Sequence, residues 1–282
     1  MKIDQLRALG AFAFLTFASA MSAQTAARYT FPPADLMRLG VYYYPEAWPA
    51  TQWPRDLANI KKLARLVHSG KVKPQKAKKF TNVLVVGIGG SALGPQFVVK
   101  ALGSASRDKM RVYFFDNTDP DGMDQVLAEI VCKLGQTLCL VISKSGGTKE
   151  TRNGMLEAKA AYERVGLSFA QHAVAVTGVG SELDRFASKE GWLKRFPMWD
   201  WVGGRYSVWS AIGLPLAVAV GAQHFRDFLA GGHAMDQHFW SAPAEQNLPL
   251  VMALLGVWNR NFQDCPTHLI AAYPSRLFQI GR

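Results

Sequence analysis

Residues 143–151 read SKSGGTKET, a stretch rich in hydroxyl groups and glycine. It follows an apolar run at residues 137–142 that is typical of a strand, and a helix-like stretch begins near Thr148. The hydroxyls of Ser143, Ser145 and Thr148, together with free backbone N–H groups, should therefore converge at the N-terminus of a helix. Such a terminus binds phosphate readily. A solvated turn is the alternative interpretation of the stretch taken alone.

Short apolar runs on both sides of this stretch alternate with helical patterns. Strands are predicted at residues 82–86, 111–115, 137–142 and 173–177. Helices are predicted at residues 121–134, 150–165 and 181–190, and a Ser-x-x-Asp cap formed by Ser181 and Asp184 opens the last of them. Alternating strands and helices joined by short loops predict an α/β fold: a doubly wound, mostly parallel sheet flanked by helices.

A second glycine-rich loop, GIGGSALGP at residues 87–95, follows the first predicted strand. Ligands of doubly wound sheets bind beyond the carboxyl ends of the strands, so this loop and residues 143–151 should line one site. Gly87, Gly89 and Ala92 also satisfy G-x-G-x-x-A, with Asp116 after the second strand, which is a dinucleotide pattern. A sugar phosphate explains both loops, because one would grip the phosphate and the other would approach the sugar. We favour the sugar phosphate and keep the dinucleotide as the alternative.

The composition excludes few classes of protein. The chain has 282 residues, of which 49% are hydrophobic and 19% charged, as in an ordinary globular protein. Much of the net charge of +11 lies at residues 61–79, without interleaved aromatic residues, which favours a solvated connector over a nucleic-acid partner. Cys132, Cys139 and Cys265 have no metal-ligand spacing. The longest later apolar stretch, residues 211–222, is too short to span a membrane and is predicted to be a core helix.

The first residues predict a secretory signal peptide at residues 1–23. Lys2 and Arg7 precede the apolar run at residues 11–20, and small residues near its end offer cleavage points. A buried N-terminal helix is the alternative.

Residues 37–63 include GVYYYPEAWP and then an amphipathic pattern from about Trp53. A strand, an aromatic loop and a helix are how a (β/α) barrel begins, and these residues resemble the opening of bacterial β-galactosidases of the glycoside hydrolase clan. We therefore expect residues 24–65 to be a barrel-opening fragment and connector. Glycosidases need two carboxylates at a set separation, and the family's pair lies on later strands, so Glu46 is not assigned a catalytic role. A glycoside hydrolase fragment stays only as a remote alternative.

The stretch DWVGGRYSVWSAIG at residues 200–213 adds an arginine to the predicted site. Gly203 and Gly204 permit a tight turn, and the guanidinium of Arg205 can stabilise a developing oxyanion, although a structural ion pair would explain it equally well. Together with VVGIGGSALGP, FFDNTDPDG, ISKSGGTKETRNGM, VTGVGSELDRFA and APAEQNLPLVMALLGVWNRNF, this stretch closely resembles the glucose-6-phosphate isomerase family over residues 67–273.

The resemblance implies where a sugar phosphate binds. By motif position, the phosphate would be held by Ser143, Lys144 (through its backbone), Ser145 and Thr148, with Ser91 nearby. Gly89, Gly90 and Gly204 would let the loops approach the sugar. The ligands implied are glucose 6-phosphate and fructose 6-phosphate.

The resemblance also implies a reaction of glycolysis and gluconeogenesis, the aldose–ketose isomerisation of these sugars. Arg205 would stabilise the cis-enediolate, and Glu150 would support the loop and the sugar hydroxyls. No metal or organic cofactor is implied, because only a proton moves. The family's proteins are cytoplasmic homodimers, with no nucleic-acid or membrane partner, whereas a working signal peptide would imply export.

The resemblance further implies two sugar isomerase domains, the first at residues 66–200. Residues 201–282 would be the helical start of the second, which we expect to be truncated. In the family, a glutamate base, a ring-opening histidine and a late lysine lie beyond the matching region, and neither Glu245 nor the histidines of this chain match them. We therefore expect binding without turnover. A dimer completed by another chain, a non-catalytic sugar-phosphate-binding module and a non-functional fusion fragment stay open.

Overall fold

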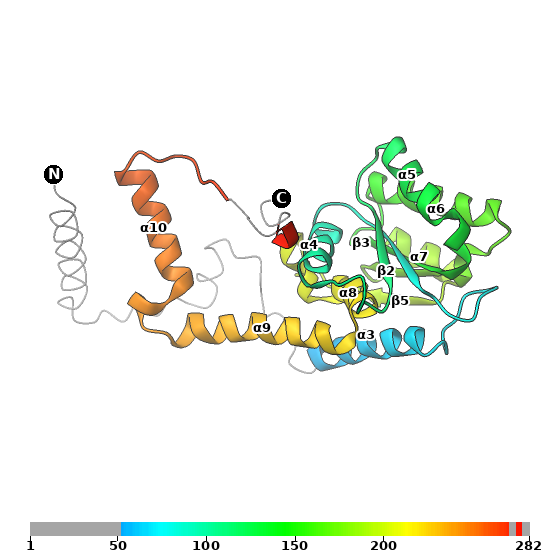
Figure 1. Ribbon diagram of the computed structural model, residues 1–282, viewed down its shortest axis with the longest axis horizontal. Coiled ribbons are helices and arrows are strands. Elements are labelled where there is room, and N and C mark those ends of the chain that lie inside the picture. The colour runs from blue at the N-terminus through cyan, green and yellow to red at the C-terminus, as the bar shows by residue number, and fades with distance from the viewer. Residues whose placement is uncertain (1–51, 271–274, 278–282) are drawn as a thin grey trace. The chain divides into compact units, whose positions relative to one another are not determined.

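The computed structural model describes residues 52–270 and 275–277; the side chains of residues 52, 53, 205 and 206 are outside this description (Figure 1). The predicted signal peptide at residues 1–23 and nearly all of the β-galactosidase-like stretch also lie outside the described residues.

The core of the fold is a five-stranded parallel sheet with the strand order β2-β1-β3-β4-β5. The strands are β1 (Asn82–Val86), β2 (Arg111–Phe115), β3 (Thr137–Ser143), β4 (Ala173–Thr177) and β5 (Lys194–Pro197). Every residue of β1, β3 and β4 is buried, as expected for parallel strands covered on both faces. The strand order reverses between β1 and β3, and ligands of such sheets bind at that point, beyond the carboxyl ends of the strands.

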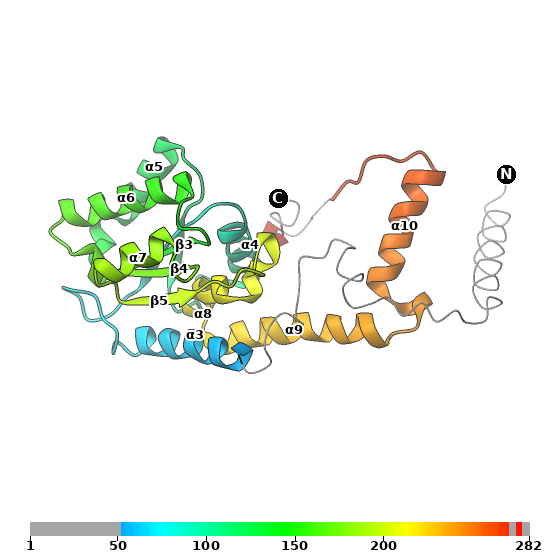
Figure 2. The same cartoon turned by 180° about the vertical axis from the view of Figure 1, so that it is seen from behind.

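Helices cover both faces of the sheet (Figures 1 and 2). Because side chains alternate along each strand, Val83, Leu140 and Val176 face one cluster of core residues, and Leu84, Val141 and Ala175 face the other. The first cluster packs against α3 (Gln52–His68), α4 (Leu93–Leu102) and α8 (Leu214–Ala219). The second packs against α5 (Pro120–Ile130), α6 (Lys149–Arg164) and α7 (Glu182–Lys189). The predicted doubly wound α/β fold is confirmed.

Two elements differ from the predicted ones. The helix predicted at residues 121–134 ends at Ile130 and continues as the 3₁₀ helix η4 (Val131–Gln136). The single core helix predicted at residues 211–222 is wrong, because this stretch contains the 3₁₀ helix η7 (Ala211–Gly213) and then α8. Proline is tolerated at the first helical positions and not in the interior, so Pro215 places the start of the α-helix there.

Helix α3 changes the expected organisation of the N-terminal half. Ile60, Ala64 and Val67 of this helix are buried in the core of the sheet. The domain boundary expected at residue 65 therefore falls inside a core helix. The first lysines of the basic run at residues 61–79 belong to the same helix, so they are not part of a connector.

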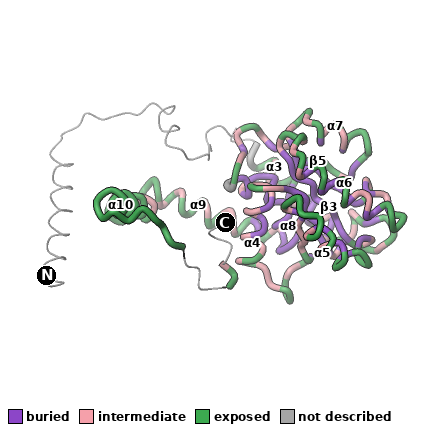
Figure 3. The backbone as a smooth tube through the Cα atoms, turned by 90° about the horizontal axis from the view of Figure 1, so that it is seen from above, coloured by how far each residue is buried: buried purple, intermediate pink, exposed green. Residues whose placement is uncertain are grey.

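Two later helices, α9 (Ala222–Ser241) and α10 (Leu248–Phe262), expose apolar side chains. Met252 of α10 is 69% exposed and Phe262 is 67% exposed, and Figure 3 shows α10 exposed along its length. Helix α10 thus carries an exposed apolar surface that includes Leu248, Met252 and Leu255. Of the helices in the described ranges, none has the length and apolar character that a membrane crossing requires.

The buried imidazole of His172 joins three parts of the fold. Its Nδ1 lies 3.0 Å from the carbonyl oxygen of Thr137, and its Nε2 lies 3.5 Å from the backbone nitrogen of Gln75. The rings of Phe80 and Tyr162 pack against it. Burial lowers the pKa of His172 below its ordinary value of 6.5, and the Thr137 carbonyl opposes this shift in part.

We expect the protein to lose stability as the pH falls below about 6.5. The neutral imidazole is favoured in the folded state, so its contribution is complete above the unfolded-state pKa and is lost as the pH falls through that value toward the folded-state pKa. Urea unfolding at a series of pH values should show this slope in the wild type and a weaker slope in His172→Gln. His224→Gln, a change at an exposed histidine, is the control. Equal slopes in wild type and His172→Gln would contradict the assignment.

Candidate functional site

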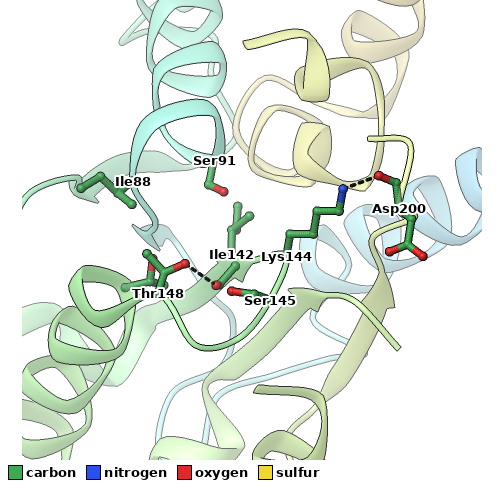
Figure 4. A pocket seen from close by; sticks show the side chains of 9 residues that line it. Ile88, Ser91, Ile142, Lys144, Ser145, Thr148 and Asp200 are labelled. Atoms are coloured by element: carbon green, nitrogen blue, oxygen red, sulfur yellow. Dashed lines mark hydrogen bonds between the residues drawn. The ribbon is translucent and has the colours of Figure 1, made fainter. Parts of the chain in front are cut away.

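A cavity of about 430 Å³ opens between the loops that follow β1 and β3 (Figure 4). The residues that line it are Ile88, Ser91, Ile142, Ser143, Lys144, Ser145, Thr148, Thr151 and Asp200. All five residues predicted to hold a phosphate are among them. The strand-order reversal between β1 and β3 explains the position, because the two loops diverge there and leave a crevice.

The loop after β3 points its hydroxyl groups at this cavity. Ser143 is the last residue of β3; its Oγ accepts a hydrogen bond from the Gly146 N–H (3.2 Å) and donates one to Thr148 Oγ1 (3.3 Å). Ser145 Oγ accepts a hydrogen bond from the Gly147 N–H (3.2 Å). These bonds hold the loop in a tight turn, and the loop is called the phosphate loop below (residues 143–148).

Thr148 is the N-cap residue of α6, but its side chain makes no capping hydrogen bond. The first-turn N–H groups of α6 thus donate no hydrogen bond to this hydroxyl, although the side-chain oxygen of an N-cap threonine normally accepts one. The positive end of the helix dipole adds to these donors. The arrangement suits a bound anion at the start of α6.

Gly146 lets the phosphate loop pack against α7. Its φ of +72° lies in the left-handed region, and a Cβ built on it would overlap the backbone nitrogen of Leu183. Leu183 lies in the first turn of α7, which Ser181 caps by accepting a hydrogen bond from the Asp184 N–H (3.1 Å). The predicted Ser-x-x-Asp cap is confirmed. The start of α7 packs directly against the phosphate loop at Gly146.

The two glycine loops predicted to approach a sugar lie against each other. A Cβ built on Gly90 would overlap the carbonyl oxygen of Gly204. The buried hydroxyl of Ser207 lies between the two loops, 3.1 Å from the Gly90 oxygen and 2.6 Å from the Gly204 oxygen, and can donate to either. Gly90 belongs to the 3₁₀ helix η3 (Gly89–Ser91) and Gly204 to η6 (Gly204–Trp209), so these two elements form one wall. Ser91 of η3 lines the cavity, whereas Gly89, Gly90 and Gly204 are not among its lining residues.

Lys144 carries the one positive charge among the residues that line the cavity. Its ammonium group donates a hydrogen bond to the carbonyl oxygen of Asp200, and Figure 4 shows the side chain reaching across to that residue. Its own carbonyl oxygen accepts a hydrogen bond from the Gly178 N–H (2.9 Å). The residue is thus held at both ends, and its contact through the side chain was not predicted.

The two residues expected to act in catalysis are Glu150 and Arg205, and neither is among the described side chains that line the cavity. Glu150 lies in the first turn of α6 and is half exposed. The backbone of Arg205 follows Gly204 in η6, but its side chain lies outside the described part. Their roles stay predictions.

Four lining residues were not predicted: Ile88, Ile142, Thr151 and Asp200. Thr151 is buried and stands three residues after Thr148, so the spacing of a helix could have indicated it. The backbone carbonyl of Asp200 accepts the hydrogen bond from Lys144, and no pattern of side chains in the sequence can reveal such a contact.

The structure disfavours the dinucleotide alternative. Asp116, which that pattern requires for a ribose, is not among the residues that line the cavity, and its carboxylate accepts a hydrogen bond from Gln96 Nε2 (2.7 Å). Within the described ranges, no group of three or more histidine, cysteine, aspartate or glutamate side chains is arranged to hold a metal ion.

Comparison with known proteins agrees with this geometry. The family model for phosphoglucose isomerase matches residues 50–281. The glucose-6-phosphate isomerase of Geobacter sulfurreducens is 64% identical over 219 residues, which are 77% of this chain and 41% of that protein. The glucose-6-phosphate isomerase of Geobacter sp. strain M21 is 52% identical over 238 residues, 84% of this chain and 44% of that protein.

A solved structure of a glucose-6-phosphate isomerase has a similar fold. A glucose-6-phosphate isomerase from Chlamydia trachomatis superposes with a TM-score of 0.72 at 36% identity, over 80% of this chain and 41% of that chain. The chain spans less than half the length of each of these relatives. Because the family model covers more than half of the chain and the fold agrees, the chain belongs to the phosphoglucose isomerase family.

Proposed function

We propose that this chain binds a sugar phosphate and forms part of a site for the aldose–ketose isomerisation of glucose 6-phosphate and fructose 6-phosphate. One observation carries the proposal. The five residues that the sequence assigns to the phosphate come from two loops about 50 positions apart, and all of them line a single cavity at the N-terminus of α6.

In this proposal, the two ends of the cavity hold different parts of the ligand. The phosphate would accept hydrogen bonds from the hydroxyls of Ser145 and Thr148 and from first-turn N–H groups of α6. The sugar would then extend toward the wall formed by Gly90 and Gly204. Arg205 follows Gly204 directly, so its guanidinium would stabilise the enediolate at the sugar end. No metal or organic cofactor enters this scheme.

Proton transfer between C1 and C2 also needs a general base. Asp200 provides the one carboxylate among the residues that line the cavity. In Figure 4, Lys144 lies between Asp200 and the hydroxyl groups of the loop. We propose that the base is supplied by another chain that completes the site, and that the chain by itself binds without turnover. The same proposal places the protein in the cytoplasm, where sugar phosphates are made.

The test is a calorimetric titration of the chain with fructose 6-phosphate and with fructose, with a coupled isomerase assay on the same sample. We expect saturable binding of fructose 6-phosphate, no measurable binding of fructose, and no turnover. Turnover would show that a base lies within this chain. Absence of binding would contradict the proposed function.

The change Thr148→Ala should weaken fructose 6-phosphate binding by about 1–3 kcal/mol, because it removes a hydroxyl that faces the anion. Calorimetry gives the affinity. Thr81→Ala is the control, since Thr81 bonds the side chain of Gln136 away from the cavity. An unchanged affinity in Thr148→Ala would overturn the assignment of the phosphate loop.

A further inference from the structure

The ammonium group of Lys144 connects two segments that lie far apart in the sequence. Lys144 follows directly after β3, and the hydrogen bond from the Gly178 N–H to its carbonyl oxygen fixes its backbone to the loop after β4. Its side chain therefore starts from a fixed backbone position at the carboxyl end of β3, an inner strand of the sheet. From there it reaches Asp200 in the segment that joins β5 to η6, called the β5–η6 segment here (residues 198–203).

The β5–η6 segment leads straight to the wall of the predicted sugar site. A turn closed by the hydrogen bond from the Val202 N–H to the carbonyl oxygen of Trp199 (3.0 Å) contains Asp200. Gly204 follows and rests against Gly90, held by the hydroxyl of Ser207. The path into η6 is therefore held at its far end by Ser207 and within the turn by Lys144. Trp199 Nε1 donates a further hydrogen bond to Asp56 (2.8 Å).

We propose that Lys144 is a positioning residue: its side chain holds the β5–η6 segment in place and thereby sets where Gly204 and Arg205 stand relative to the phosphate loop. A hydrogen bond from a charged donor is stronger than one between neutral groups, which suits a single bond that restrains a turn. Asp200 itself is exposed, whereas Met198 and Val202 on either side of it are buried, so the bond from Lys144 restrains the tip of the turn between them. The effect of Lys144 on ligand binding rests on the proposed function, whereas its effect on the segment does not.

Hydrogen exchange of the ligand-free chain, followed by mass spectrometry, tests the position of the segment. In Lys144→Met, which keeps an unbranched side chain but removes the donor, amides of residues 198–203 should exchange roughly tenfold faster. Lys144→Arg, which restores a charged donor, should return the rate toward that of the wild type. Lys149→Met removes a lysine outside the cavity lining on the first turn of α6 and should leave these amides unchanged. Unchanged exchange in Lys144→Met overturns the proposal.

Affinities for two probes show whether positioning affects the sugar end. Lys144→Met should weaken fructose 6-phosphate binding by a larger factor than it weakens binding of inorganic phosphate, because the sugar contacts the displaced wall and the phosphate does not. Equal factors would mean that the ammonium acts only as a phosphate ligand, and would overturn the proposal. If the wild type bound no fructose 6-phosphate, the proposed function would fail, and the exchange rates would still decide the role of Lys144.

Discussion

Replacing Gly90 by alanine should greatly weaken sugar-phosphate binding, with a loss of up to about 3 kcal/mol in affinity or in stability. The added methyl group would overlap the carbonyl oxygen of Gly204. This atom belongs to the backbone and is held by Ser207, so it cannot swing away as a flexible side chain would. The loops after β1 and after β5 would have to separate, which opens the wall that we assign to the sugar.

Calorimetry with fructose 6-phosphate and urea unfolding together measure this effect. Gly135→Ala is the control, because a Cβ there would meet no atom within 4 Å. If Gly90→Ala binds fructose 6-phosphate as the wild type does, the close contact of the two loops does not matter for the site.

The second large effect is expected for Gly146→Ala. Alanine at a φ of +72° is strained, at a cost of about 1–2 kcal/mol, and its methyl group would also overlap the backbone nitrogen of Leu183 at the start of α7. The phosphate loop would have to move away from α7, which would misplace the hydroxyls of Ser145 and Thr148. We expect loss of phosphate binding and a fall of more than about 2 kcal/mol in the free energy of unfolding.

A matched variant separates the two causes. Gly180 has nearly the same φ, +73°, but a Cβ there would meet no atom within 4 Å, so Gly180→Ala should show the strain alone. Urea unfolding compares the two variants, and titration with inorganic phosphate reports on the loop. If both changes cost the same free energy and phosphate binding is intact, α7 does not support the loop.

Most of the strands could be predicted from the sequence because their signal is local. The runs at β1, β2 and β4 have the predicted bounds, since continuous apolar residues between turn signals allow few other structures. β5 was missed, because Lys194–Pro197 has two charged residues and a proline in four positions and depends on pairing with β4. Strand formation there follows from tertiary contacts.

The candidate site was predictable to the extent that side chains form it. Ser143, Ser145 and Thr148 stand in one loop, and the rule that parallel strands end at the same edge brings Ser91 to them. The contact of Gly90 with Gly204 and the bond from Lys144 to Asp200 involve backbone atoms of segments more than 50 residues apart. Such contacts depend on the assembled fold, and no spacing in the sequence indicates them.

The most direct test of the proposed site is a crystal structure of the chain with fructose 6-phosphate. The account predicts the phosphate group at the N-terminus of α6, within hydrogen-bond distance of the hydroxyls of Ser145 and Thr148, with the sugar directed toward Gly90 and Gly204. A phosphate group bound elsewhere, with this cavity unoccupied, would contradict the central claim that the phosphate loop holds the ligand.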